Sequence, residues 1–282
     1  MRRLVWTIAV FVSSTASAAV PPTNTNVVAV AEDAFGITLG PESLGLYSPS
    51  SVRGFSPLSA GNLRLNGLYF DQQGQMVDRL VYDTRMRVGL AAVNFPWPAP
   101  TGIVDYTLRQ PKDTSALTSI VYAGPYDSRE IDLDGYTKLW DNRLGIAGGL
   151  SFRRDVDIPG LTARISSFGV LPQWTPNESL TLSMFWGRRN YTDARTTPFI
   201  FLSADQSPPR LSLRYFGQPW AEGDFDSEHY GVLTNATFGE HWSLRAGIFR
   251  SIYDSPRSYS ELYLDTSSDG IGTHTIIAGF PR

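Results

Sequence analysis

The sequence predicts a mainly β protein built in two parts. Residues 34–112 are expected to form a small α+β domain, and residues 113–282 to supply antiparallel strands of a transmembrane β-barrel. Composition favours this class, because aromatic residues make up 12% of the chain and its 25 glycines and 19 prolines suit strands joined by turns. An N-terminal export signal and alternating runs of about ten residues after Ser115 support the barrel.

Residues 1–18 have the pattern of a Sec-type signal peptide. Arg2 and Arg3 precede the apolar run Leu4–Val12, and Ala16–Ala18 provides the small residues that precede a cleavage point. The apolar run is too short to cross a hydrocarbon core, which needs about 20 residues in a helix. No later segment approaches a transmembrane helix, so an exported chain of this kind enters a membrane as a β-barrel.

The composition excludes several classes of function. The chain has no cysteine, which excludes disulfides and thiolate ligands, and its three histidines, His229, His241 and His274, lie far apart. No metal site or cofactor is therefore predicted. Lys and Arg total 24 against 27 Asp and Glu, and the basic residues are scattered, so no nucleic-acid surface is predicted.

The segment EIDLDGYTKLW, residues 130–140, shows the alternation clearly. Its apolar and charged residues fall on opposite faces of a strand: Ile131, Leu133 and Leu139 against Glu130, Asp132, Asp134 and Lys138. The pattern recurs in later runs, with apolar positions Leu144, Ile146, Leu150 and Phe152; Leu180, Leu182, Met184 and Trp186; Trp242, Leu244, Ala246 and Ile248; and Leu262 and Leu264. One face of each strand suits lipid and the other suits water.

A water-soluble antiparallel sandwich would also alternate in this way. The signal peptide favours the barrel, and so do aromatic residues near the ends of the runs, as in the girdle of a membrane barrel. These aromatic residues are Trp140, Trp174, Trp186, Tyr191, Trp242 and Tyr253.

Two acidic clusters offer alternative chemistry. The oxygens of Glu130, Asp132, Asp134 and Asp141 nearly match a calcium-binding loop, but the same residues alternate as a strand, and the strand interpretation is favoured. Glu222, Asp224, Asp226 and Glu228 could supply paired carboxylates for glycoside hydrolysis, but a solvated loop is the favoured interpretation. Without a nucleophile elbow or a zinc-binding helix motif, the chain is predicted not to be an enzyme.

The stretch VRGFSPLSAGNLRLNGLYFDQQ resembles the plug domain of TonB-dependent outer-membrane receptors, particularly the siderophore-receptor branch. The residues that match are Arg53, Gly54, Phe55, Asn62, Arg64, Gly67, Tyr69 and Asp71. A second match, MRVGLAAVNFPWPAPTGIVDYTLRQP, resembles the end of the plug through Arg87, Val88, Gly102, Val104, Asp105, Tyr106, Arg109 and Pro111. It lacks the Gly-Pro that commonly follows the Arg-Val pair in the family.

The resemblance implies a location in the outer membrane of a Gram-negative cell, a ferric siderophore as ligand, and TonB as the energy-coupling partner. The motif residues would then serve as a packed gate, whose arginines find carboxylate or backbone partners on the inner barrel wall. A flexible leader, residues 19–33, would carry the TonB box at Val27, Val28, Ala29, Val30 and Ala31, which adds as a strand to the partner. Ligand-binding residues are not identified by the motifs.

The chain departs from the family in length. Plugged outer-membrane transporters use about 22 strands, whereas the part after Ser115 offers about eight to ten. The chain is therefore predicted to be the N-terminal part of a receptor, with its strands in an open curved sheet that has unpaired edges. Two alternatives stay open: a small complete outer-membrane barrel or porin-like protein, and a periplasmic or secreted β-rich hydrolase.

Overall fold

The computed structural model describes residues 28–33, 36–39, 47–93, 95, 99, 101–204, 207, 213–267, 269 and 271–279. This part of the chain is mainly β, as predicted, and contains no α-helix. Its helical turns are three 3-10 helices, η1 (Asp78–Leu80), η2 (Gly89–Ala92) and η3 (Pro125–Asp127). In the described residues, no helix is both long and apolar enough to cross a membrane.

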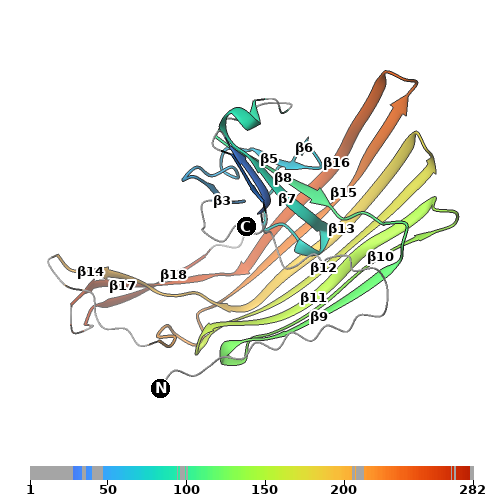
Figure 1. The fold of residues 1–282 in the computed structure, drawn as a ribbon. Coiled ribbons are helices and arrows are strands. Elements are labelled where there is room, and N and C mark those ends of the chain that lie inside the picture. Colours follow the sequence, from blue (N-terminus) through green and yellow to red (C-terminus); the bar gives the residue numbers. More distant parts are fainter. Residues whose placement is uncertain are drawn as a thin grey trace.

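A mixed six-stranded sheet occupies the region predicted as the plug, with strand order β2-β1-β7-β8-β5-β6 (Figure 1). Its strands are β1 (Val28–Asp33), β2 (Gly36–Leu39), β5 (Leu63–Leu65), β6 (Leu68–Tyr69), β7 (Val81–Arg87) and β8 (Ile103–Leu108). The pairs β1·β7 and β5·β8 are parallel. A short hairpin, β3 (Tyr47–Ser48) and β4 (Ser51–Val52), accompanies the sheet. We call the described residues from Val28 to Arg109, which include the sheet, the hairpin and their connections, the plug.

The strand β1 differs from the flexible leader expected over residues 19–33. Val28–Asp33 lie between β2 and β7 and pair with both, and the Ala31 side chain is buried. Four of the five TonB-box candidates, Val28 to Ala31, are thus strand residues inside the plug sheet, because pairing on both sides satisfies their backbone groups. Val27 lies outside the described residues.

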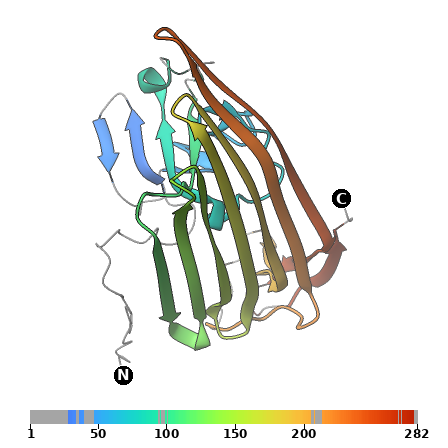
Figure 2. The same ribbon diagram turned by 90° about the vertical axis from the view of Figure 1, so that its right-hand side faces the viewer.

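A seven-stranded antiparallel sheet, which we call the wall, follows the plug with strand order β16-β15-β13-β12-β11-β10-β9. Its strands are β9 (Ala116–Ala123), β10 (Arg129–Leu139), β11 (Leu144–Ile158), β12 (Leu161–Asn177), β13 (Leu180–Arg195), β15 (Glu222–Phe238) and β16 (Trp242–Arg257). Figures 1 and 2 show a curved sheet with β9 and β16 at its edges. The predicted open sheet with unpaired edges is confirmed for the described residues.

A third sheet, with order β14-β17-β18, extends from one end of the wall (Figure 1). Its strands are β14 (Phe199–Leu202), β17 (Tyr259–Thr266) and β18 (Thr273–Ala278). The seven strands of the wall and the three of this sheet agree with the eight to ten strands predicted after Ser115.

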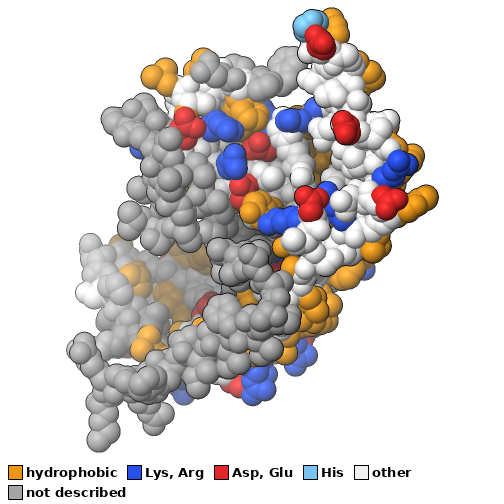
Figure 3. Space-filling view, turned by 45° about the vertical axis from the view of Figure 1, so that its right-hand side comes forward, with side chains coloured by type: hydrophobic (Ala, Val, Ile, Leu, Met, Phe, Trp, Pro, Cys, Tyr) orange, Lys and Arg blue, Asp and Glu red, His pale blue; other side chains and the backbone are white. Residues whose placement is uncertain are grey.

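The two faces of the wall follow the predicted alternation. On β10, Glu130, Asp132 and Asp134 are buried on the inner face, toward the plug, whereas Ile131 and Leu139 are exposed on the outer face. The strand interpretation of residues 130–140 is thus confirmed, and the charged face meets protein. Figure 3 shows hydrophobic side chains along the right-hand edge of the molecule, where some charged side chains also lie.

The predicted aromatic girdle is correct only in part. Trp174 and Trp242 are exposed on the outer face, and Trp140 is exposed in the turn after β10. Tyr191, by contrast, points inward and donates a hydrogen bond to Gln75 of the plug. The inner-facing tyrosines contact the plug. The position of an aromatic residue within a run does not show whether it faces the membrane or the plug.

The prediction of a solvated loop around the acidic run 222–228 is wrong, because this segment is the first half of β15. Its carboxylates have partners on neighbouring strands, which makes an extended acidic segment tolerable. The pairs are Glu222 with Arg195, Asp224 with Arg257, Asp226 with Arg188, and Glu228 with the Trp186 indole.

Candidate functional site

The plug packs into the concave inner face of the wall, and the two share one hydrophobic core. The core joins Met76 and Leu80 of the plug to Ala147, Leu171 and Phe185 of the wall, all of which are buried. The plug is therefore held by burial of apolar surface as well as by the polar contacts described below.

A row of three glycines on the inner face of the wall receives the helical turn η1. Gly149, Gly169 and Gly187 are register partners on β11, β12 and β13. A Cβ atom on Gly169 would lie 2.8 Å from the backbone carbon of Arg79, and one on Gly187 would lie 2.8 Å from Leu80 Cδ1. Without side chains in this row, η1 rests directly on the wall backbone, and we call the row the glycine seat.

Arg79, at the centre of η1, is fully buried and faces three carboxylates. Its Nη2 lies 3.0 Å from Asp78 Oδ2, and its Nη1 lies 3.3 Å from Asp132 Oδ2 and 3.0 Å from Asp134 Oδ2. The two wall aspartates come from the polar face of β10 that the sequence alternation predicted. A plug cation thus compensates two wall carboxylates that would otherwise be buried uncompensated.

Two further arginines complete this ionic cluster. Arg109 of the plug donates to Asp134 through Nη1 and to the Val81 carbonyl through Nε at 3.1 Å. Arg189 of β13 lies 3.6 Å from Asp78 through its Nη1. The cluster therefore contains three arginines and three aspartates and is electrically balanced, which is the condition for burying charge at tolerable cost.

The Asp78 carboxyl is ionised within this cluster. Burial opposes its ionisation, but the guanidinium groups of Arg79 and Arg189, together with a hydrogen bond from the Ser167 hydroxyl, hold its pKa below the ordinary value. Asp78 therefore links the plug turn to β12 and β13, in addition to its bond with Arg79.

The plug segment that precedes η1 crosses the remaining strands of the wall. The Gln73 amide donates to Ser251 Oγ of β16 at 2.8 Å, and His229 Nε2 of β15 lies 3.0 Å from the Gln75 carbonyl oxygen. The Tyr191 hydroxyl of β13 donates to Gln75 Oε1 at 2.7 Å. From Gln73 to Arg79, the plug thus forms polar contacts with β16, β15, β13, β12 and β10.

The arginines of the predicted plug motifs have different partners. Arg109 reaches the wall, as the resemblance implied for the motif arginines. Arg53 donates to the Tyr47 hydroxyl at 3.0 Å, and Arg64 donates to the Leu63 carbonyl at 2.8 Å, both within the plug. Arg79 belongs to neither motif and was missed, although the three acidic residues on one face of β10 are a sign that a buried cation must face them.

Other motif residues hold the plug sheet together. The Gly67 amide donates to Asp105 Oδ1 at 2.9 Å, and burial raises the pKa of this carboxyl. Asn62 Nδ2 donates to Thr101 Oγ1 at 3.2 Å. These contacts join β8 and the segment before it to the residues on either side of β5.

All three motif glycines, Gly54, Gly67 and Gly102, have a positive φ, a conformation that favours glycine. Gly54 has φ 84° in the turn after β4. Gly102 has φ 128°, and a Cβ atom there would lie 3.2 Å from Val52. Three side chains of the first motif, Phe55, Tyr69 and Asp71, are exposed. A gating role for the motif stays a prediction.

A cavity of about 340 Å³ lies between the plug and β16. Its lining includes Gln72, Gln73, Gln75 and Tyr106 of the plug and Tyr253 of the wall. Its volume falls at the lower end of the range for small-molecule sites. The Tyr106 hydroxyl and Gln72 Oε1 are both buried at this cavity, where the Gln72 side chain is a hydrogen-bond neighbour of Tyr106.

Metal-binding chemistry finds no support in the described part of the chain. No group of three or more His, Asp or Glu residues there could hold a metal ion. Asp132 and Asp134, which the calcium-loop alternative required as ligands, instead face Arg79.

Solved structures similar to this chain are siderophore receptors of the outer membrane. The ferripyoverdine receptor of Pseudomonas aeruginosa aligns with a TM-score of 0.62 and 10% identity, covering 90% of this chain and 34% of the receptor. The ferric preacinetobactin receptor BauA of Acinetobacter baumannii gives 0.60 and 13%, covering 77% of this chain and 33% of the receptor. The ferric-catecholate import receptor Fiu of E. coli gives 0.61 and 11%, covering 77% and 37%.

These similarities establish the fold. The chain has the fold of the plug and part of the barrel of siderophore receptors, which confirms the resemblance predicted from the motifs at the level of structure. The chain spans about a third of the length of the receptors that it matches. No protein-family model and no curated protein matches the sequence.

Proposed function

We propose that the chain is the plug and part of the barrel of an outer-membrane receptor that binds a ferric siderophore and imports it with energy from TonB. The observation that carries the proposal is the way in which the plug lies in the wall. A buried ionic cluster holds the plug against the concave polar face of this open sheet, and the other face of the sheet is apolar. The solved structures of similar fold include the receptor bound to ferripyoverdine and the receptor for ferric preacinetobactin.

The lengths of the connections give the orientation in the membrane. The turns after β10, β12 and β15, residues 140–143, 178–179 and 239–241, are short and lie at one end of the wall. The opposite end carries the long segment 196–221 and the sheet of β14, β17 and β18. Outer-membrane barrels have short periplasmic turns and longer extracellular loops, so the end with β14 is the extracellular one.

The cavity between the plug and β16 is the proposed ligand site. Tyr253 offers aromatic surface, and the side-chain amides of Gln73 and Gln75 offer hydrogen-bond donors and acceptors. A chelate rich in oxygen atoms and rings uses both kinds of contact. The two open edges of the wall disfavour the small complete barrel, which requires strands that close.

Tyr253→Ala is expected to weaken the binding of a ferric siderophore about fivefold, because the aromatic contact is worth about 1 kcal/mol. The measurement is quenching of intrinsic fluorescence of the detergent-solubilised chain by a panel of ferric hydroxamate, catecholate and mixed siderophores. Tyr230→Ala, on the outer face of β15, is the matched control and should bind as the unmodified chain does. Binding by none of the chelates, or equal loss in both variants, would contradict the proposed site.

The TonB box proposed at Val27 to Ala31 requires β1 to leave the plug sheet, because β1 pairs with β2 and β7. Ala31 and Met86 are register partners on β1 and β7, and both are buried. Since the chain has no cysteine, the variant Ala31→Cys with Met86→Cys would contain one engineered disulfide.

Oxidation of this double-cysteine variant is expected to abolish binding of the periplasmic domain of TonB, and reduction is expected to restore it. The measurement is co-purification of the two proteins before and after treatment with a thiol reductant, with Ala31→Cys alone as the control. Binding that the disulfide leaves unchanged would show that TonB engages another segment.

A further inference from the structure

The outer face of the wall carries three arginines side by side. Arg129, Arg154 and Arg164 are register partners on β10, β11 and β12, and their side chains are 70, 49 and 69% exposed. Their carboxylate partners are Asp127, which is shared by Arg129 and Arg154, and Asp193, beside Arg164. In these ion pairs, three exposed arginines thus share two carboxylates.

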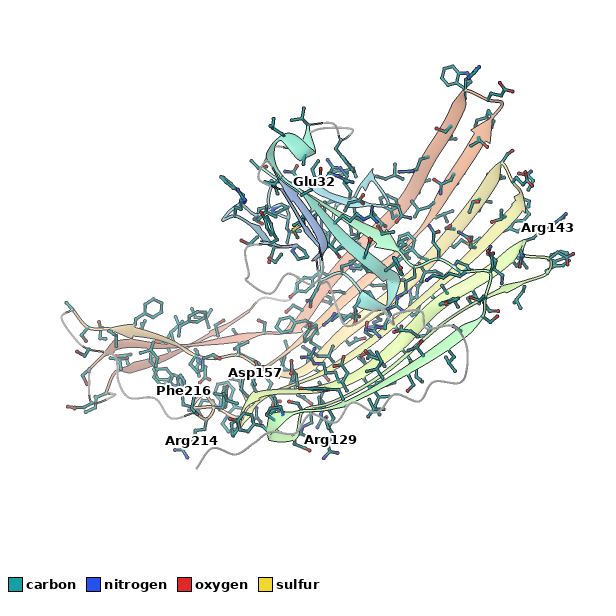
Figure 4. The ribbon with its side chains drawn as sticks, viewed as in Figure 1. Glu32, Arg129, Arg143, Asp157, Arg214 and Phe216 are labelled. Atoms are coloured by element: carbon teal, nitrogen blue, oxygen red, sulfur yellow. The ribbon has the colours of Figure 1, made fainter. Side chains whose placement is uncertain are left out.

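The row lies near the end of the wall that we assign to the extracellular side. Figure 4 shows Arg129 at this end, together with Arg214 and Phe216, whereas Arg143 lies at the opposite end. The position places the arginines beside the head groups of the outer leaflet when the outer face is in the membrane.

An apolar hollow of about 620 Å³ lies further along the same face of the same strands. Its floor contains the register partners Gly135 and Gly148, which have no side chains. Its rim is formed by hydrophobic side chains from four strands: Leu117, Leu133, Ile146, Leu150, Phe168 and Val170. The hollow is a shallow, open depression, and most of its exposed surface is apolar.

The hollow and the arginine row are joined by apolar side chains. Ile131 and Phe152 are register partners on the outer face between them, and they are 48 and 60% exposed. From Leu150 to Arg154 the strand advances about 13 Å, at about 3.3 Å per residue. An elongated molecule with an anionic head and a hydrocarbon tail can therefore contact the row and the hollow at once.

We propose that this surface binds a lipid of the outer leaflet that carries phosphate on its head group, with a phosphate on the arginine row and an acyl chain in the hollow. Guanidinium groups bind phosphate through paired charge-assisted hydrogen bonds. An acyl chain makes more van der Waals contacts in an apolar depression than on a flat row of Leu and Phe side chains. The inference rests on the proposed function, because it requires the outer face to lie in the membrane with the β14 end outward.

The test uses lipid A, a phosphorylated and acylated disaccharide, bound to the detergent-solubilised chain and counted by native mass spectrometry. Arg154→Gln with Arg164→Gln is expected to weaken binding at least tenfold, since each basic residue near anionic lipid contributes about fivefold. Arg143→Gln, at the opposite end, is the matched control and should leave lipid A binding unchanged. Phosphatidylcholine should bind all three proteins equally.

The hollow is tested separately by Gly135→Leu, whose side chain would occupy it. A Cβ atom at this position meets its nearest neighbour, the Ala116 carbonyl oxygen, at 3.3 Å, so the strand can accept a side chain with a small adjustment. Lipid A binding is expected to fall several-fold in this variant, and the far-ultraviolet circular dichroism spectrum should stay that of the unmodified chain.

Two outcomes would overturn the lipid site. Equal binding of lipid A by the double arginine variant and by the unmodified chain would show that the arginine row does not contact the head group. Displacement of lipid A by inorganic phosphate at similar concentration, with no effect of Gly135→Leu, would reduce the row to a simple anion site. Siderophore quenching measured on the same variants separates this failure from a failure of the proposed function, because the cavity beside Tyr253 lies on the other face of the wall.

Discussion

Replacing Arg79 with alanine is expected to lower the free energy of plug opening by about 3–5 kcal/mol. The change removes the cation that faces Asp78, Asp132 and Asp134 and leaves three buried carboxylates with two arginines. The measurement is hydrogen exchange at the amides of Leu80 and Arg109, which are bonded to the Val77 and Leu80 carbonyls. Both amides should exchange faster by at least two orders of magnitude, since each 1.4 kcal/mol is tenfold.

Arg85→Ala is the matched control for this prediction. Arg85 also forms an ion pair within the plug, with Asp83, but its side chain is 51% exposed. An exposed pair contributes about 0–1 kcal/mol, so exchange at Leu80 and Arg109 should change little. Equal effects of the two variants would show that the plug is held by its apolar core and that the ionic cluster is incidental.

Replacing Gly169 with valine is the second change with a large expected effect. The new Cβ atom would lie 2.8 Å from the backbone carbon and 3.0 Å from the carbonyl oxygen of Arg79. Because backbone cannot rotate away as a flexible side chain can, the turn η1 must move off the glycine seat. We expect a cost of about 1–3 kcal/mol from overpacking, with further loss as Arg79 is displaced from Asp134.

The effect of Gly169→Val is measured by limited proteolysis of the plug and by the same two exchanging amides. Gly135→Ala on β10 is the control, because that glycine belongs to the outer face and its added Cβ atom meets its nearest neighbour at 3.3 Å. Rapid cleavage in the plug of Gly169→Val, with the wall strands intact, is the expected result. A protease-resistant plug in this variant would show that η1 does not rest on the glycine seat.

The alternating pattern made much of the wall predictable. A strand exposes its side chains to opposite faces in turn, so the segment from Glu130 to Trp140 revealed one charged and one apolar face without knowledge of the partner. The pattern could not reveal that the charged face meets Arg79, which lies far away in sequence and belongs to neither plug motif. Contacts between distant segments depend on how the sheets pack, and period-2 alternation carries no information about packing.

Two segments were assigned to the wrong kind of structure because local composition was overridden by pairing. Val28–Asp33 follow a segment rich in Pro, Asn and Thr, yet they form β1 between two other strands. The acidic run from Glu222 to Glu228 resembles a solvated loop, but arginines on β13 and β16 compensate its charges and permit a long strand. Strand formation here depends on cross-strand partners more than on intrinsic preference.

A double-mutant cycle between Arg79 and Asp134 tests most directly whether the plug is held on the wall by the buried cluster. Arg79→Met and Asp134→Leu should each accelerate exchange at the Leu80 and Arg109 amides, because each leaves the cluster with unbalanced charge. The double variant retains two arginines and two aspartates. Its loss in the free energy of plug opening should therefore be smaller than the sum of the two single losses by about 0.5–3 kcal/mol. Strictly additive losses would contradict the account, since they would mean that these two residues do not act on each other across the boundary between plug and wall.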